Sequence, residues 1–299
     1  MARPESPGPP AATASPAPAP AGGPAAAGAG DDFEARRAAR ARRSRVRLAV
    51  DRTIAILVPL LLWQLLGQLW SGGKWISSPL EVAERLWTLA ADGTLWLHTW
   101  ETLKEALVGL VTGVVVGAVA GVLLGTWKRL SDAVDPVIMG FYSLPRVSLA
   151  PLFIIWLGIG LIAKVALVAS IVLFVVLFNV REGVRGIDRE VVEAFRSMNA
   201  SRGAMIRYVV VPSLVPWLLA AVRIGIGMAL IGAVVGEMVG SARGLGWYVM
   251  HTSGVYDITG SITTLVVLMI LAMIFNGALA LLERKMLHWR RGSDSWTTG

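Results

Sequence analysis

Long apolar stretches recur along the chain, and charged or turn-forming segments separate them. A helix needs about 20 residues to cross roughly 30 Å of hydrocarbon. Six stretches come close to this length, at 54–70, 106–127, 137–157, 165–180, 213–239 and 262–282. The pattern therefore predicts an all-α integral membrane protein with about six transmembrane helices.

A shorter helix is predicted between the first two apolar stretches. Ser78-Pro79-Leu80-Glu81 has the form of a capping box with proline at the first helical position. Apolar residues then follow at helical spacing until Asp92-Gly93. We expect an amphipathic helix on the outer membrane surface, with nearby tryptophans at the level of the lipid headgroups: Trp75, Trp87, Trp96 and Trp100.

Glycine occupies every fourth position through the second apolar stretch: Gly109, Gly113, Gly117, Gly121 and Gly125. Small residues at this spacing share one face of a helix, and they let two helix backbones approach closely in lipid. The stripe therefore predicts a tightly packed bundle. The partner helix belongs either to this chain or to a second copy, and the sequence leaves both open.

Charged and helix-breaking residues interrupt the apolar stretches at a few places. Arg223 and Glu237 lie in the fifth stretch, and Pro145-Arg146 lies in the third. A charge inside a membrane must pair with another group, reach the interface or face water. These four residues are candidates for a pathway or gate. The alternatives are a structural ion pair, an interfacial charge and, at Pro145, a simple kink.

The remaining polar side chains suggest no chemistry. We expect Asn179 and Asn276 to form hydrogen bonds between helices. His98, His251 and His288 are scattered, and we expect them in loops or at the membrane interface. Because their spacing does not match a metal site, we predict neither a metal nor a cofactor.

Composition indicates a membrane domain with polar tails. Hydrophobic residues make up 55% of the 299, charged residues make up 16%, and the mean hydropathy is +0.63. The absence of cysteine excludes disulfides and thiolate chemistry. Residues 1–47 are rich in Ala, Pro and Gly and then in Arg, so we expect a disordered cytoplasmic tail. Residues 48–290 form the predicted transmembrane domain, and 291–299 form a C-terminal cytoplasmic tail.

The net charge of +8 would suit a nucleic-acid partner, but the placement of the basic residues argues against one. If the N-terminus is cytoplasmic, most of the 28 Lys and Arg residues fall in cytoplasmic segments. This bias is the one that orients membrane proteins. We therefore predict both termini in the cytoplasm, membrane lipid around the bundle and no nucleic-acid partner.

The polar segment 181–212 separates the fourth and fifth apolar stretches. Asp188 can cap a short helix there, and Asn199 can end it because Asn tolerates a left-handed conformation. A second short helix would lead to Pro212. The first helix would present one apolar side, formed by Val191, Val192, Phe195 and Met198. Physical reasoning leaves two functions open, which are docking to a soluble partner and resting on the lipid surface.

This segment resembles the coupling motif of binding-protein-dependent ABC importer permeases. In that family a Glu-Ala-Ala triplet is followed after three residues by Gly, and later by an aliphatic-x-aliphatic-Pro ending. The matching residues here are Glu193, Ala194, Val209, Val211 and Pro212. Two positions depart from the motif. Phe195 replaces the second Ala, and Asn199 stands at the Gly position, where it is the best steric substitute.

The resemblance covers about residues 54–290 and extends to the nitrate, taurine and aliphatic-sulfonate branch. The motifs that carry it are Ser78-Pro79, Leu144-Pro145, Pro151-Leu152, Trp156-Leu157-Gly158-Ile159-Gly160, Arg223-Ile224, Gly236-Glu237-Met238 and Gly244-Leu245-Gly246. It implies the importer-permease (MetI-like) fold in the bacterial plasma membrane. It also implies a homodimer, two ATPase subunits and an extracytoplasmic binding protein that delivers a small solute such as a sulfonate, taurine or nitrate.

The resemblance also implies roles for residues. Glu193, Ala194, Phe195, Asn199 and Pro212 would couple to the ATPase, and Pro145, Arg146, Arg223 and Glu237 are the weaker candidates for the pathway or gate. The chain itself has no Gly-x-x-x-x-Gly-Lys-Ser/Thr loop, so we expect ATP hydrolysis on a separate subunit and no enzymatic activity here. The alternative is a transporter driven by an ion gradient, which should show inverted repeats.

Overall fold

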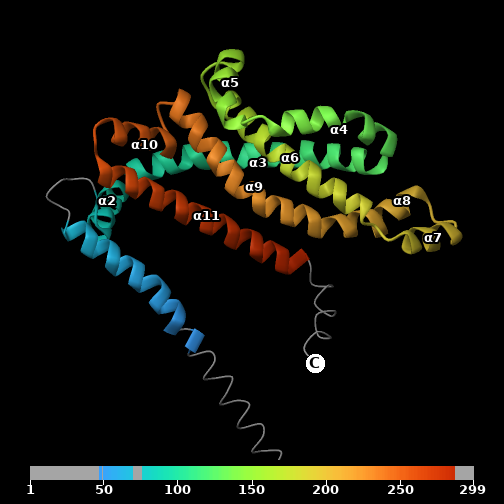
Figure 1. The fold of residues 1–299 in the computed structure, drawn as a ribbon, viewed down its shortest axis with the longest axis horizontal. Coiled ribbons are helices and arrows are strands. Elements are labelled where there is room, and N and C mark those ends of the chain that lie inside the picture. Colours follow the sequence, from blue (N-terminus) through green and yellow to red (C-terminus); the bar gives the residue numbers. More distant parts are fainter. Residues whose placement is uncertain (1–46, 49, 70–75, 287–299) are drawn as a thin grey trace, which may run out of the picture. The chain divides into compact units, whose positions relative to one another are not determined.

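Every regular element in the described part of the chain is a helix (Figure 1). The computed structural model describes residues 47–48, 50–69 and 76–286. Five of its helices are long and apolar enough to cross a membrane, or six if one bent pair forms a single span. This agrees with the prediction of about six spans. The predicted C-terminal tail at 291–299, and all of the predicted N-terminal tail at 1–47 except Arg47, lie outside the described residues.

The first apolar stretch forms the helix Val50–Leu69. The amphipathic helix predicted after it is α2 (Pro79–Ala91). Its capping box is confirmed, because the Ser78 side chain accepts from the Glu81 backbone and the Glu81 carboxylate accepts from the Ser78 backbone. The helix ends at Asp92, and Gly93 follows with φ +85°. The chain can then reverse into the next helix.

The second stretch is α3 (Thr94–Thr126), which begins twelve residues earlier than the predicted start at 106. Its first turn is fixed by Asp92, whose carboxylate accepts a 2.9 Å hydrogen bond from the Thr94 backbone. That hydrogen bond lowers the pKa of Asp92. The polar residues before 106 therefore belong to a long helix and not to a loop.

The third apolar stretch, predicted as a span at 137–157 with a possible kink at Pro145, is not one continuous helix. Instead α4 (Lys128–Ser143) is followed by the 3-10 turn η2 (Arg146–Leu149) and α5 (Ala150–Leu157), with a bend of 79° between them. Leu144 is extended, with ψ 135°, because the residue before a proline avoids the helical region. Pro145 also lacks the N–H that would continue the ladder.

The fourth stretch forms α6 (Leu161–Arg185), which is longer than predicted at both ends. The polar segment contains α7 (Arg189–Ser197), α8 (Arg202–Met205) and η3, a π-helical turn (Ile206–Val210). The last stretches form α9 (Val211–Gly240) and α11 (Ile258–Met286), with the short α10 (Leu245–Gly254) between them. In Figure 1, α7 and α8 lie at one end of α6 and α9, and α10 lies at the other.

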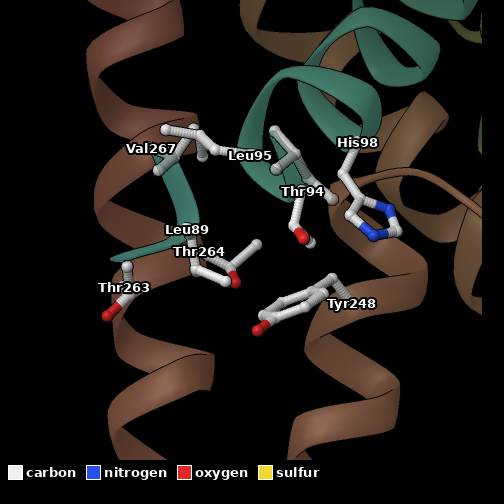
Figure 2. A pocket seen from close by; sticks show the side chains of 9 residues that line it. Leu89, Thr94, Leu95, His98, Tyr248, Thr263, Thr264 and Val267 are labelled. Atoms are coloured by element: carbon white, nitrogen blue, oxygen red, sulfur yellow. The ribbon is translucent and has the colours of Figure 1, made fainter. Parts of the chain in front are cut away.

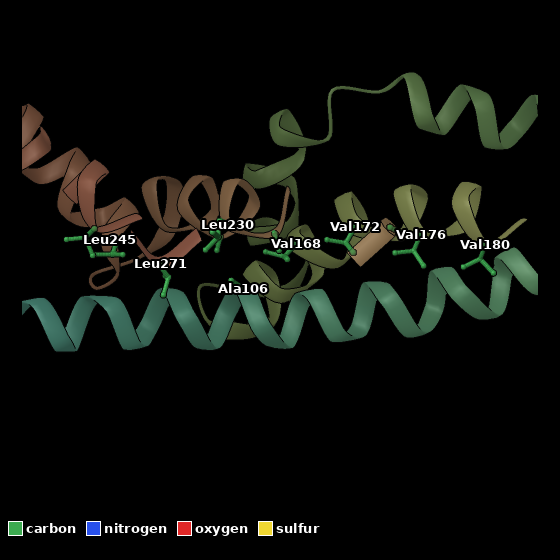
Figure 3. Packing of buried hydrophobic residues seen from close by; sticks show 12 residues of the cluster. Ala106, Val168, Val172, Val176, Val180, Leu230, Leu245 and Leu271 are labelled. Carbon is green, nitrogen blue, oxygen red and sulfur yellow. The ribbon is translucent and has the colours of Figure 1, made fainter. Parts of the chain in front are cut away.

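The core is built where the glycine stripe of α3 meets a row of valines on α6. A methyl group added to Gly113 or Gly121 would fall 2.8 Å from Val172 or Val180, which is closer than real contacts allow. The same register pairs Gly109 with Val168, Gly117 with Val176 and Gly125 with Val184. Figure 3 shows Val168, Val172, Val176 and Val180 on the side of α6 that faces α3. The stripe therefore packs within the chain.

Within the described residues, neither asparagine in the spans is hydrogen-bonded to another helix, contrary to the prediction. The side-chain amide of Asn179 donates to the Val175 carbonyl, and that of Asn276 donates to the Ala272 carbonyl, each at 2.8 Å. Both partners lie one turn earlier in the same helix. An amide can satisfy itself locally in this way, so its presence in an apolar run does not require a neighbouring helix.

Candidate functional site

The polar segment presents a short amphipathic helix, α7, at one end of the bundle (Figure 1). Asp188 caps it as predicted, since its carboxylate accepts a 2.9 Å hydrogen bond from the Glu190 backbone. Val191 is 41% exposed and Met198 is 67% exposed, whereas Val192 and Phe195 are half-buried. The apolar side is therefore shared between the bundle and the surface, and part of it is available to a partner.

Asn199 ends this helix in the left-handed conformation that its position in the motif predicts, with φ +52°. The Ala200 backbone then donates to the Phe195 carbonyl at 3.1 Å, which closes the turn. Ser201 starts α8 by accepting from the Ala204 backbone at 3.2 Å. Pro212 lies in the first turn of α9, where no backbone donor is needed. Glu193 and Ala194 are exposed on α7.

The break in the third span places Arg146 against aromatic rings. Its guanidinium lies 4.3 Å from the centre of the Phe174 ring and 5.0 Å from that of Tyr142. It also donates to the Tyr142 carbonyl at 2.8 Å. No ion pair with a carboxylate is found for Arg146 among the described residues. Its positive charge is stabilised by the faces of these two aromatic rings and by the Tyr142 carbonyl.

Arg223, by contrast, forms an ion pair with Glu283 of α11. Its side chain is 55% exposed and points away from the core. The two arginines singled out in the apolar stretches therefore have different environments. The charge of Arg223 is offset within the chain, and Arg146 has rings as its closest neighbours.

Glu237 lies in a buried polar network that the sequence interpretation did not assemble. It is 1% exposed, accepts from the Thr102 hydroxyl at 2.6 Å, and accepts from the Gly246 backbone at 2.6 Å. Thr102 in turn accepts from the Leu245 backbone at 2.8 Å, and the His98 Nδ1 accepts from the Gly244 backbone at 2.9 Å. Three side chains from α3 and α9 thus cap the start of α10.

Gly244 is required at this junction. Its φ of +111° is unfavourable for other residues. A Cβ there would also collide with the Glu237 carboxylate. The Gly244-Leu245-Gly246 motif therefore lets the backbone of α10 sit directly on a buried carboxylate.

An ion pair between Glu105 and Lys164 extends the network to α6. Both side chains are buried, at 1% and 8% exposure. The Lys164 ammonium also donates to the Ser241 hydroxyl at 3.1 Å. One prediction was wrong here. His98 was expected in a loop or at the membrane interface, and it is buried in α3. Lys164 is likewise buried, in α6.

The sequence did contain a signal for this network. His98, Thr102 and Glu105 are spaced four and three residues apart, and Gly109 follows after four more. They therefore continue the glycine face of α3 toward its N-terminus. Polar side chains that lie in line with a packing stripe are expected to be buried against partners in other helices and not to lie on the surface.

Two cavities near α10 and α11 are poor places for a polar solute. The cavity in Figure 2, between His98, Tyr248 and Thr264, has a volume of about 10 Å³, which is room for about one water molecule. Burial there raises the pKa of the Tyr248 hydroxyl. A larger cavity of about 400 Å³ lies between α2, α3 and α11, and apolar side chains such as Leu86 and Ile270 line it.

The comparisons with known proteins agree on one family. The family model described as "Binding-protein-dependent transport system inner membrane component" matches residues 113–288. The riboflavin transport system permease protein RibX of Chloroflexus aurantiacus is 38% identical over 72% of this chain and 80% of its own length. A putative aliphatic sulfonates transport permease protein, SsuC of Escherichia coli, is 32% identical over 76% of this chain and 87% of its own.

Solved structures agree on the fold. An inward-facing structure of the MetNI methionine ABC transporter contains a chain that matches with a TM-score of 0.57 and 27% identity. The match covers 64% of this chain and 96% of that one. The matched family and this fold together account for the apolar helices as spans of a multi-pass membrane protein.

Proposed function

Because this chain belongs to the family of inner-membrane components of binding-protein-dependent transport systems, we propose that it is the permease subunit of an ATP-driven importer, with α7 as the helix that docks into a separate ATPase. The observation that carries the docking role is α7 itself. It is capped by Asp188, closed by a left-handed Asn199, and exposes Val191 and Met198 beside charged side chains. An apolar ridge with a charged rim is suited to a soluble partner.

The same proposal sets the topology. Both termini and α7 lie in the cytoplasm, and α2 and α10 lie on the outer side, where a solute-binding protein would dock. The basic residues support this orientation, since Arg181, Arg185 and Arg189 cluster at the α7 end. A second copy of the chain completes the pathway.

The solute is proposed to be small and either a compound with an anionic group, such as a sulfonate, taurine or nitrate, or a planar heterocycle. The relatives carry names of both kinds, a riboflavin permease and an aliphatic sulfonate permease. Arg146 suits either chemistry, because it combines a positive charge with the ring faces of Tyr142 and Phe174. Arg223 is less suited, because Glu283 already offsets its charge.

The test is co-purification of the full-length chain with the ATPase encoded beside it, in mild detergent. We expect wild type to retain the ATPase, and Phe195→Asp and Met198→Asp to lose it while keeping the wild-type melting temperature. Met198→Asp is the clearer test of docking, because Met198 is 67% exposed and its replacement disturbs little packing. Tyr256→Asp, an 83% exposed aromatic at the opposite end, is the matched control and should retain the ATPase. Failure of wild type to bind any ATPase would contradict the proposal and favour gradient-driven transport.

A further inference from the structure

Helices α4 and α6 are joined by side chains from both helices that meet between them. We call this set the α4–α6 ladder. On α4 and the following turn it consists of Ser131, Asp135, Tyr142 and Arg146, and on α6 of Phe174, Phe178, Arg181 and Arg185. The intervals are four, seven and four residues along α4 and the following turn, and four, three and four residues along α6. Each set therefore lies along one helix face, and the two helices run antiparallel.

The polar half of the ladder lies at the end of α6 that leads into α7. Arg181 forms an ion pair with Asp135, and its side chain is only 8% exposed. Arg185 donates to the Ser131 hydroxyl at 2.8 Å, and Ser131 is fully buried. Only Gly186 and Ile187 separate the end of α6 from Asp188, the cap of α7. A shift of α7 therefore acts directly on these two arginines.

The aromatic half of the ladder lies next to the break in the third span. The Tyr142 ring meets the edge of Phe178 with centres 5.0 Å apart, and Arg146 lies over Phe174 at 4.3 Å. Tyr142 is two residues before Leu144, where the helix ends. The ladder thus runs from the coupling segment to the 79° bend.

The remaining surface of α4 is largely exposed within this subunit. Ser131 is its one buried residue, while Val137 and Phe141 are 59% and 58% exposed. Arg181 is 8% exposed and Asp135 is 33% exposed, so breaking their ion pair leaves a buried arginine with only a longer 3.8 Å contact to Glu182. The Asp135–Arg181 link therefore resists separation more than an exposed contact would. Helix α4 is therefore expected to follow the cytoplasmic end of α6 and not the rest of the bundle.

We propose that the α4–α6 ladder transmits movement of α7 to the bend at Pro145, with Asp135 and Arg181 as positioning residues. This rests on the proposed function, because it takes α7 as the ATPase-docking helix. When the ATPases close, α7 moves with the end of α6, the ion pair moves α4, and the angle between α4 and α5 changes. Without the ion pair, ATP hydrolysis continues and the bend no longer responds.

The chain contains no cysteine, so introduced cysteines give clean spin-label sites. One label replaces Gly140 near the end of α4, where an added Cβ meets nothing within 4 Å. The second replaces Ile274 on α11, which is 60% exposed. The distance between them is measured by electron spin resonance in the complex with the ATPase, with and without ATP and orthovanadate. Hydrolysis and ATPase retention are measured on the same samples.

In the doubly labelled protein with no further change (the parent), we expect nucleotide to shift the distance between the labels. Asp135→Asn and Arg181→Met should abolish the shift, while ATPase retention and hydrolysis persist. The exchanged pair Asp135→Arg with Arg181→Asp should restore it, which also covers the case in which a single variant folds poorly. Asp132→Asn, an exposed acid one turn earlier on α4, is the matched control and should shift like the parent. A shift that survives loss of the ion pair would overturn the relay, and so would a parent that binds the ATPase but shows no shift. Loss of ATPase binding by the parent would instead overturn the proposed function.

Discussion

Individual charged residues in the spans differ mainly in what surrounds them. Glu237 and Lys164 are buried and hydrogen-bonded, whereas Arg223 is paired at an exposed site and Arg146 lies on aromatic rings. Sequence alone places all of them in or beside apolar stretches, because it gives the position of a charge along the helix but not its neighbours. The left-handed Asn199 could be predicted, because its conformation depends on local backbone sterics.

Loss of the Lys164 charge should destabilise the protein strongly. Lys164→Met leaves Glu105 as a buried, unpaired carboxylate, and breaking one side of a buried pair costs about 3–5 kcal/mol. The double variant Lys164→Met with Glu105→Leu should recover much of that loss, since no uncompensated charge remains. Thermal unfolding in detergent measures both, with Lys104→Met as the control, since Lys104 is 35% exposed and pairs with Glu101 near the surface. Equal stability of the single variant and wild type would show that the pair is not buried as described.

The two arginines should differ in their effect on uptake. Arg146→Gln removes the charge beside Phe174 and should reduce uptake of a solute with a sulfonate group, whereas Arg223→Gln should act mainly through its pair with Glu283. Radiolabelled taurine uptake into cells, with riboflavin as the uncharged-ring comparison, separates charge recognition from general loss. If Arg223→Gln alone reduced taurine uptake, Arg146 would be excluded as the counter-charge.

Helices were predicted well where a sequence repeat defined them, and poorly where a single residue determined the course of the backbone. The four-residue glycine repeat identified α3 as a packing helix, and α6 supplies the matching valines. The kink considered at Pro145 is a bend of 79° in the structure, and hydropathy gives no sign of its size because the apolar stretch continues through Leu144-Pro145. The early start of α3 at Thr94 was missed for the opposite reason, since its polar first turns are buried by partners that are distant in sequence.

The glycine stripe should tolerate no larger side chain. Gly117→Val introduces atoms into the space of Val176 and the Leu173 carbonyl, and overpacking of this kind costs roughly 1–3 kcal/mol or more. Gly140→Val is the control, because a Cβ at Gly140 meets nothing within 4 Å. Expression level and melting temperature should fall for the first variant and stay near wild type for the second. A stable Gly117→Val would mean that α3 and α6 can separate.

At the scale of the whole molecule, hydropathy predicts the number of spans, whereas the placement of the basic residues predicts on which side of the membrane each end of the bundle lies. The fold and the family agree with the sequence interpretation, because apolar length and the motif around Glu193 are local properties. The buried network of Glu105, Lys164 and Glu237 could not be predicted, because it unites three helices separated by as many as 132 positions along the chain.

The proposed topology gives a direct labelling test. In the cysteine-free chain, Ser197→Cys at the end of α7 should be protected from a membrane-impermeant maleimide in intact cells and react after lysis. Gly254→Cys at the end of α10 should react in intact cells, since a Cβ there meets nothing within 4 Å. The reverse labelling pattern would show that the orientation is inverted, with α7 on the side of the membrane opposite to the cytoplasmic ATP.

The single face of α3 that carries His98, Thr102 and Glu105 and then the glycine stripe also limits how the gene can change. Adding or deleting one residue rotates everything beyond it by about 100°. An insertion between Glu105 and Gly109 would keep either the cap on α10 or the contact with α6, but not both. Substitutions on the outer face, at residues such as Val111 or Val115, face no such limit. Descendants of this protein should therefore differ in the residues of α3 but share its length between these two contacts, and length variation should accumulate elsewhere in the chain.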